Sequence, residues 1–219
     1  MDDFRGQSFP AVAQAFSRLT RKGTLQRLSK GVYYRPRKTS FGPSRPSPAA
    51  IRQLAQRTKT VFPSGSSAAN LLGFTTQTPM RGEVATSSLS LPKKLIGAET
   101  RVHARRPEAW RELSETEAAI LDFLRSGGKT GELSPEQTVS RMLHLLSQDK
   151  RLKKLLAVAD TEPPRVRALL GAFAEELQTR PSTLEKLRAT LNPLSRFNFG
   201  QFSTLPTARK WLAKESQRA

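Results

Sequence analysis

The chain has 219 residues, 37% hydrophobic and 25% charged, which supplies enough apolar material for a buried core and too much for a wholly disordered protein. It contains 37 Lys and Arg against 18 Asp and Glu, a formal net charge of +19, so a polyanionic partner is the first hypothesis. Cysteine is absent, which excludes disulfides and Cys-ligated zinc. No apolar run approaches the ~18 residues of a membrane span, and no signal peptide is visible. We expect a soluble, cytoplasmic protein.

The positive charge is concentrated in the first half of the chain. Residues 1–107 hold 19 basic and 4 acidic residues, whereas residues 108–219 hold 18 basic and 14 acidic residues. A solvated, solubilising surface is the alternative explanation for such an excess. The excess in the first half is larger than solubility requires, so we expect an anion-binding surface there.

Residues 8–22 have the periodicity of an amphipathic helix. Ser8 is a suitable N-cap, and Gly23 offers a left-handed stop. One apolar stripe recurs at spacings of three and four residues and is expected to be buried; it consists of Phe9, Val12, Phe16 and Leu19. The opposite face is polar and basic and carries no acid.

A short hairpin is predicted directly after this helix, over residues 24–36. Two segments rich in Leu, Val and Tyr flank Ser29-Lys30-Gly31, and glycine supplies the positive φ that a tight turn requires. Of the adjacent Tyr33 and Tyr34, one ring is expected to pack beneath the hairpin and the other to be exposed, because successive strand residues face opposite sides. A basic helix, a glycine stop and a basic hairpin correspond to the second half of a winged helix-turn-helix.

The domain boundary is predicted in the stretch 35–48, which is rich in Pro, Gly and basic residues and is expected to be irregular. The predicted fold class is α+β. It comprises a winged-helix-like module at 1–38, a linker at 39–48 and a second domain at 49–219, with a mixed α/β part (49–110) and a helical part (111–219).

The mixed part of the second domain is predicted from short apolar segments. A helix is expected over 48–59 with Ile51 and Leu54 buried, another over 66–74 stopped by Gly73, and strands between about residues 83 and 106. Four further residues of this part are expected in the core: Phe62, Leu71, Leu72 and Phe74.

The helical part is predicted from its start signals. Capping boxes begin at Ser114, Ser134 and Ser182, where a Ser is followed three residues later by Glu or Gln. The segments 151–159 and 163–178 also have helical character. We therefore expect four or five helices beyond residue 111.

The residue patterns of an enzyme are missing. The two histidines, His103 and His144, lie in different segments, and no Asp-x-Asp pair is present for two-metal chemistry. Gly128-Lys129-Thr130 lacks the earlier glycine of a phosphate-binding loop and is expected to be a polar turn. Residues 63–66 resemble the Gly-Ser of nucleotidyltransferases, but no aspartate follows before Asp122, so a helix start is expected. We predict no catalytic residues, no metal and no cofactor.

Three stretches together resemble the AbiEi-type antitoxins of bacterial type IV toxin–antitoxin, or abortive-infection, systems. They are FSRLTRKGTLQRLSKGVYYRP, PSGSSAANLLGFTTQTP and LNPLSRFNFGQFSTLPTARKWL. The resemblance implies an N-terminal winged helix that binds inverted repeats in its own promoter and represses the operon. It also implies a C-terminal region that neutralises a nucleotidyltransferase toxin encoded next door, without a stable complex.

The sequence departs from this pattern at its start. A complete winged helix-turn-helix has one or two helices before the recognition helix, and only seven residues precede Ser8 here. Either the true start lies upstream of Met1 or the module is truncated, and Phe4 is then a remnant packing contact.

Candidate DNA contacts lie on the polar face of the helix and on the hairpin. Gln14, Arg18 and Arg21 are candidate base readers, because Gln pairs with adenine and Arg with guanine through two hydrogen bonds. The candidate phosphate contacts are Ser17, Lys22, Arg27 and Lys30. The alternative functions are an RNA- or ribosome-associated binding protein, which the charge fits equally well, and an enzyme acting on nucleic acid, which the missing His and Asp clusters disfavour.

Overall fold

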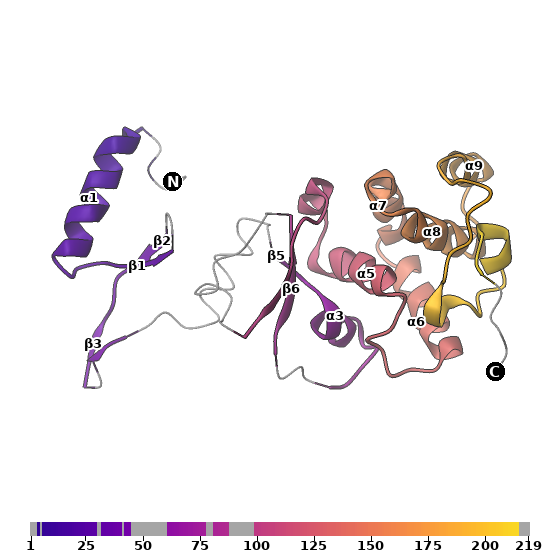
Figure 1. Cartoon of the computed structure of the whole chain (residues 1–219), viewed down its shortest axis with the longest axis horizontal. Coiled ribbons are helices and arrows are strands. Elements are labelled where there is room, and N and C mark those ends of the chain that lie inside the picture. The colour runs from indigo at the N-terminus through magenta and orange to yellow at the C-terminus, as the bar shows by residue number, and fades with distance from the viewer. Residues whose placement is uncertain are drawn as a thin grey trace. The chain divides into compact units, whose positions relative to one another are not determined.

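The protein is mixed α and β and divides into two compact units. The computed structural model describes residues 4, 6–29, 32–40, 42–44, 61–77, 81–87 and 99–214. Unit 1 comprises residues 1–58 and 91–100, and unit 2 comprises residues 59–90 and 101–219. Helices and small sheets occur together over the described ranges (Figure 1), which confirms the α+β class. None of the helices described there is long and apolar enough to cross a membrane.

The described part of unit 1 contains one helix and two short antiparallel pairs of strands. Helix α1 spans Phe9–Arg21 and is followed by strands β1 (Gln26–Ser29) and β2 (Val32–Tyr34). Gln26 pairs with Tyr34 and Ser29 with Val32, so the predicted hairpin is confirmed with a two-residue connection. Strands β3 (Lys38–Thr39) and β4 (Gly42–Pro43) form a second ladder. The prediction of irregular chain over 35–48 is therefore wrong for these residues.

Unit 2 begins with a three-stranded sheet that carries one helix. Its strands are β5 (Val61–Pro63), β6 (Glu83–Thr86) and β7 (Arg101–His103), with β5 antiparallel and β7 parallel to β6. Helix α3 (Gly65–Leu72) contacts β5 and β6, and Gly73 ends it at φ +72° as predicted. The predicted helix at 48–59, with Ile51 and Leu54, lies outside the described residues.

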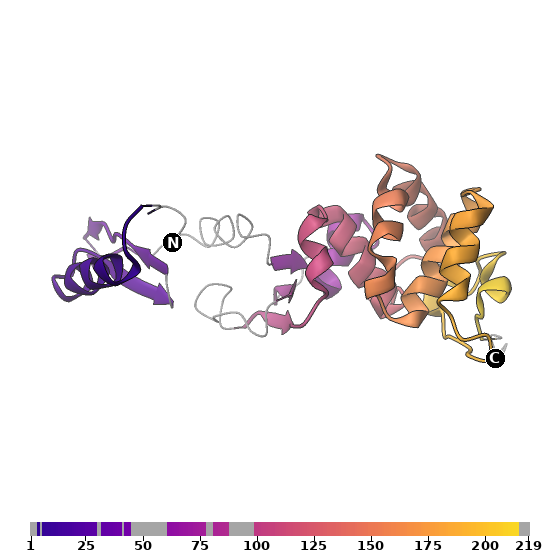
Figure 2. The ribbon, with the colours of Figure 1, turned by 90° about the horizontal axis from the view of Figure 1, so that it is seen from above.

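Over residues 104–214, five α-helices and four short 3₁₀ helices follow the sheet, and the α-helices lie to one side of it (Figures 1 and 2). The α-helices are α5 (Glu115–Ser126), α6 (Pro135–Ser147), α7 (Arg151–Ala157), α8 (Pro164–Glu176) and α9 (Pro181–Ala189). The 3₁₀ helices are η2 (Glu108–Glu112), η3 (Ala159–Thr161), η4 (Gly200–Phe202) and η5 (Ala208–Trp211).

The capping boxes at Ser114 and Ser134 are confirmed in both of their hydrogen bonds. The third, at Ser182, is wrong. Helix α9 begins one residue earlier, at Pro181, with Arg180 as its N-cap and no side-chain cap hydrogen bond. The fixed φ of proline suits the first helical position, and this places Ser182 inside the first turn instead of before it.

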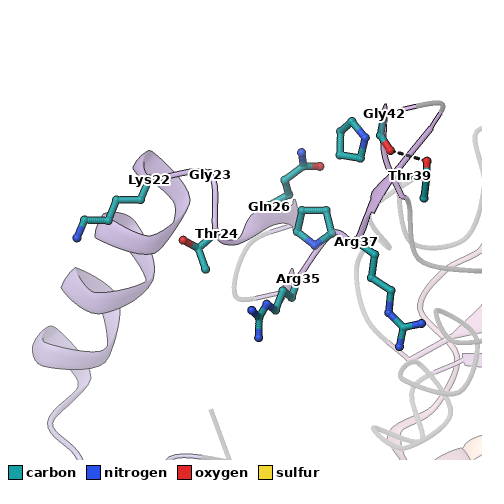
Figure 3. A pocket seen from close by; sticks show the side chains of 10 residues that line it. Lys22, Gly23, Thr24, Gln26, Arg35, Arg37, Thr39 and Gly42 are labelled. Carbon is teal, nitrogen blue, oxygen red and sulfur yellow. Dashed lines mark hydrogen bonds between the residues drawn. The ribbon is translucent and has the colours of Figure 1, made fainter.

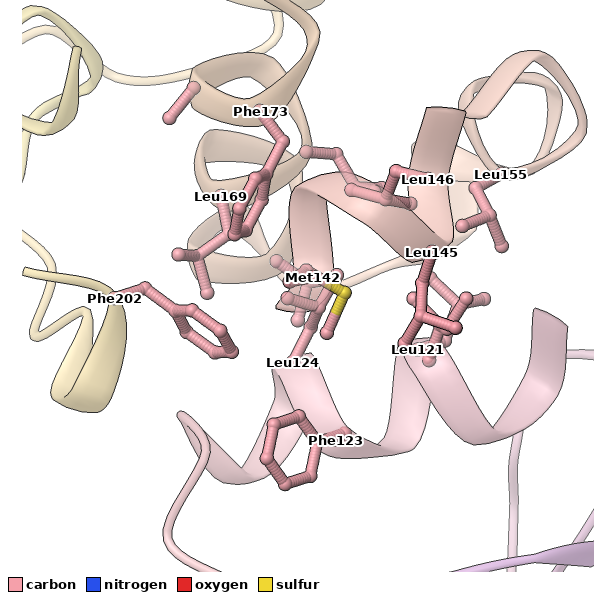
Figure 4. Close-up of a cluster of buried hydrophobic side chains, with 14 of the residues drawn as sticks. Leu121, Phe123, Leu124, Met142, Leu145, Leu146, Leu155, Leu169, Phe173 and Phe202 are labelled. Carbon is pink, nitrogen blue, oxygen red and sulfur yellow. The ribbon is translucent and has the colours of Figure 1, made fainter. Parts of the chain in front are cut away.

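The core of unit 2 is centred on Met142 of α6, which is fully buried among side chains of α5, α7, α8 and η4 (Figure 4). A continuous run of ring contacts crosses it: Phe74 stacks on Phe123 at 4.1 Å, and Phe202 lies edge-on to both Phe123 and Phe173. These contacts join the end of α3 to α5, η4 and α8. Apolar and aromatic burial of this extent is the main stabilising force in a domain.

The core prediction for the middle segment is mostly confirmed. Phe62, Leu72 and Phe74 are buried, but Leu71 is 47% exposed, so its prediction is wrong. Helix α3 turns Leu72 and the two alanines before Asn70 towards α5, and Leu71, one position away from Leu72, points off that side.

Asp122 of α5 ties three elements of unit 2 together. Its side chain is only 5% exposed and accepts hydrogen bonds from the Ser64 hydroxyl at 2.9 Å, the Gly65 amide at 2.8 Å and the Arg106 guanidinium at 2.7 Å. The carboxylate therefore satisfies the amide at the start of α3 and neutralises an arginine that follows β7. Arg106 also lies over the ring of Trp110.

Two further carboxylates of unit 2, Glu162 after η3 and Glu117 of α5, also accept several hydrogen bonds. Glu162 is buried and accepts from the Trp110 indole at 2.7 Å and from Arg125 at 2.6 Å. Burial alone would raise the pKa of Glu117, but the backbone amide of Ser114 and the ammonium of Lys154 outweigh that effect and lower the pKa below its ordinary value. The lowered pKa favours the ionised form of the Glu117 carboxyl, as expected for a buried charge that is hydrogen-bonded and paired.

Replacing Asp122 with Ala should destabilise unit 2 strongly. The change leaves the Arg106 charge and two donors without their acceptor, for which a loss of about 3–5 kcal/mol in the free energy of unfolding is expected. Both tryptophans, Trp110 and Trp211, lie in unit 2, so tryptophan fluorescence in a urea titration reports on this unit alone. Exposed Asp160→Ala is the matched control and should stay within about 0.5 kcal/mol of the wild type. Equal stability of the two variants would show that Asp122 does not hold the unit together.

Candidate nucleic-acid interface

The apolar side of α1 is only partly covered in unit 1. Val12 is buried and Phe16 is half-buried, whereas Phe9 is 66% and Leu19 37% exposed. The prediction that all four stripe residues are buried is therefore wrong for Phe9 and Leu19. The ring contacts of the helix centre on Phe16, in its middle, and these two residues lie towards its two ends.

Aromatic contacts attach the hairpin to this helix. Tyr33 of β2 stacks on Phe16 with ring centroids 4.6 Å apart, and Phe4 meets Phe16 edge-on at 5.4 Å. The expected packing role of Phe4 is thus confirmed. Tyr34 points to the other side of the strand but is half-buried, not exposed as predicted, and its hydroxyl donates a hydrogen bond to the side chain of Gln26. The stacked pair fixes the hairpin against one side of α1.

The end of α1 directs the chain into the hairpin. Gly23 has φ +74°, a conformation that side chains disfavour, and the amides of Thr24 and Leu25 both donate to the carbonyl of Leu19. The helix therefore ends at Arg21 with Lys22 as its C-cap, and β1 begins at Gln26. The predicted glycine stop is confirmed.

The predicted contact residues of the helix are exposed on its uncovered side. Four of them share one face at relative positions i, i+3, i+4 and i+7: Gln14, Ser17, Arg18 and Arg21. Lys22 is exposed one turn after Arg18. Arg18 and Arg21 also lie in the last turn, where cations interact favourably with the helix dipole, a structural role that needs no ligand.

Of the two predicted contact residues of the hairpin, Arg27 and Lys30, the structure describes Arg27 alone. Arg27 is exposed and pairs with Tyr33 across the ladder, so the two side chains share one side of the hairpin. That is the side facing Phe16, so the structure does not bring Arg27 onto the face of α1 that carries Gln14 and Arg18. Lys30 lies outside the described residues.

The stretch of sequence that forms this surface has positive side chains and no negative ones. No Asp or Glu occurs from residue 4 to residue 82, a stretch that holds 14 Lys and Arg. Within the described part of the chain, the side chains of Arg18, Arg21 and Lys22 make no ion pair or hydrogen bond. Cations without carboxylate partners produce the positive potential that attracts a polyanion.

A groove beside the helix was missed by the sequence prediction. It lies between the turn after α1 and the extended chain that joins β2 to β4, and it encloses about 1210 Å³ (Figure 3). We call it the cationic groove; its charged and polar lining consists of Lys22, Thr24, Gln26, Arg35, Arg37 and Thr39. Arg35 and Arg37 fall in the stretch predicted to be irregular. Their spacing of two after a strand is the signal that could have found them, since alternate residues of an extended chain share a side.

In unit 2 the residues that the sequence singled out for possible chemistry have partners within the unit. Ser64 of the Pro63–Ser66 segment is buried and bound to Asp122, and the segment starts α3, as predicted. His103 contacts Glu83 at 3.0 Å, and His144 contacts Gln148. Over the described ranges no group of three His, Asp or Glu side chains could hold a metal ion.

Comparison with known proteins gives a family without an assigned activity. Residues 2–104 match the model of a family described as a family of unknown function, DUF6088. The match spans the helix and hairpins of unit 1 and the sheet of unit 2, and it ends before α5. The crystal structure of the RV2827C protein from Mycobacterium tuberculosis is similar, at 17% identity and a TM-score of 0.44 over 89% of this chain and 75% of that one. No curated protein matches the chain.

Proposed function

We propose that this protein binds double-stranded DNA through unit 1, with α1 in the major groove and the β1–β2 hairpin on the phosphate backbone. The observation that carries the proposal is the face of α1 formed by Gln14, Ser17, Arg18 and Arg21. It is exposed, lies opposite the apolar contacts and belongs to a stretch without carboxylates. A helix face of these residue types matches the donors and acceptors at base edges in the major groove.

The resemblance to AbiEi-type antitoxins extends the proposal to a biological role. The protein is then a cytoplasmic repressor that binds inverted repeats in its own promoter and the antitoxin of a type IV system. It opposes a nucleotidyltransferase toxin through residues of unit 2, without forming a stable complex with it. The protein itself has no enzymatic activity and uses no cofactor in this proposal.

Substitutions on α1 test base recognition. Arg18→Ala and Arg21→Ala should each lower affinity for the promoter duplex by about 1–3 kcal/mol and weaken the preference at one base pair. Lys30→Ala should instead weaken binding to promoter and scrambled duplexes alike and reduce the slope of log K against log salt by about one. A salt titration of fluorescence anisotropy with both duplexes measures these quantities. Unchanged affinity in all three variants, or stronger binding of the wild type to RNA competitor, would contradict the proposal.

Promoter binding and toxin antagonism should be separable. Because the side chains of Arg18 and Arg21 make no hydrogen bond or ion pair within the described structure, the double variant R18A/R21A should fold and still protect cells that express the neighbouring toxin gene. Growth with the toxin induced, and a promoter–reporter measured in the same cells, give the two readouts. Asp122→Ala is the complementary variant and should lose protection, because it destabilises unit 2. Loss of protection in R18A/R21A would show that DNA binding and antagonism are one activity.

A further inference from the structure

The cationic groove has three positive charges and no carboxylate among its described lining residues. Lys22, Arg35 and Arg37 are exposed and make no hydrogen bond or ion pair through their side chains in the described ranges. Arg35 and Arg37 are separated only by Pro36 in the segment that joins β2 to β3, and both line the groove. In Figure 3 both side chains extend towards the bottom of the view, Arg35 turned to the left and Arg37 to the right.

The backbone at Arg37 is held in place by local hydrogen bonds. The amide of Arg37 donates to the Ser44 hydroxyl at 2.8 Å, and the Ser44 amide donates back to the Arg37 carbonyl at 2.8 Å. The Thr39 hydroxyl donates to the Gly42 carbonyl at 2.6 Å across the β3–β4 ladder. Arg37 thus lies at one end of a loop closed by hydrogen bonds, and a fixed backbone reduces the entropy lost when the groove binds a ligand.

We infer that the cationic groove binds consecutive phosphates of one strand of duplex DNA. A row of unpaired cations fits a chain of phosphates better than a single anion, and Arg presents parallel donors that suit phosphate oxygens. Lys22 lies one turn after Arg18, so it connects the groove with the face of α1 proposed to contact bases. The inference rests on the proposed function, and it adds Arg35, Arg37 and the β3–β4 ladder as a second backbone contact outside the β1–β2 hairpin.

Phosphate contacts have a signature that base contacts lack. Each lost contact lowers the slope of log K against log salt by about 0.9, and it weakens specific and non-specific binding by the same factor. The full-length double variant R35Q/R37Q keeps a polar side chain with an N–H donor at both positions and removes two charges. Its slope should fall by about two, with a loss of affinity on the order of 10-fold per contact at 0.1 M salt. The affinity ratio between promoter and scrambled duplexes should not change.

The matched control is R180Q/K186Q, which removes two exposed charges from α9 of unit 2. Anisotropy titrations of the wild type, both double variants and R18A with the two duplexes at four salt concentrations separate the outcomes. A slope reduced by about two only in R35Q/R37Q supports the groove as a phosphate site. An unchanged slope in R35Q/R37Q, while R18A weakens binding, overturns the inference and leaves the proposed function standing. An equal reduction in the control, or a selective loss of promoter preference in R35Q/R37Q, also overturns it. If the wild type binds neither duplex, the proposed function itself fails, and the inference falls with it.

Discussion

The positions of the carboxylates determine where positive charge is neutralised within the protein and where it stays unpaired. In unit 2, Asp122, Glu162 and Glu117 are buried and each is paired with a cation, so much of the positive charge near the core is neutralised internally. Breaking such a pair is costly because it leaves a desolvated charge without its partner. Through these pairs and their other hydrogen bonds, the three carboxylates join α5 to the start of α3, to η2, to the end of η3 and to α7, so the arrangement of the helices depends on them as well as on apolar packing.

The helix and hairpins of unit 1 contain no carboxylate of their own. They lie in a stretch of 79 residues, from 4 to 82, without a carboxylate, and the cations of α1 and of the cationic groove have no internal partners in the described structure. What attaches the hairpin to α1 is aromatic: the stack of Phe16 on Tyr33 orients the apolar side inward and leaves Arg18 and Arg21 on the other side. The cations proposed to bind an anion are therefore different residues from the aromatic ones that attach the hairpin to α1.

Local signals in the sequence predicted most elements but not their surroundings. The glycine stops at Gly23 and Gly73 and the capping boxes at Ser114 and Ser134 are confirmed, because each depends on a few neighbouring residues. The exposure of Phe9, Leu19 and Leu71 could not be predicted, because periodicity shows which residues share a face and not whether another element covers it. The Ser64–Asp122–Arg106 cluster and the cationic groove also escaped prediction, since their members are far apart in sequence or lie in a stretch taken to be irregular.

The most direct measurement is amide hydrogen exchange on the full-length protein, read by mass spectrometry with and without a saturating promoter duplex. If DNA binds to the unpaired cations of unit 1, added protection should appear in peptides covering residues 9–44, which include α1, the hairpins and the cationic groove. Peptides from α5, α6 and α8 should exchange at the same rate in both samples, because their charges are already paired. Protection confined to those helices, with none in residues 9–44, would contradict the assignment of DNA binding to unit 1.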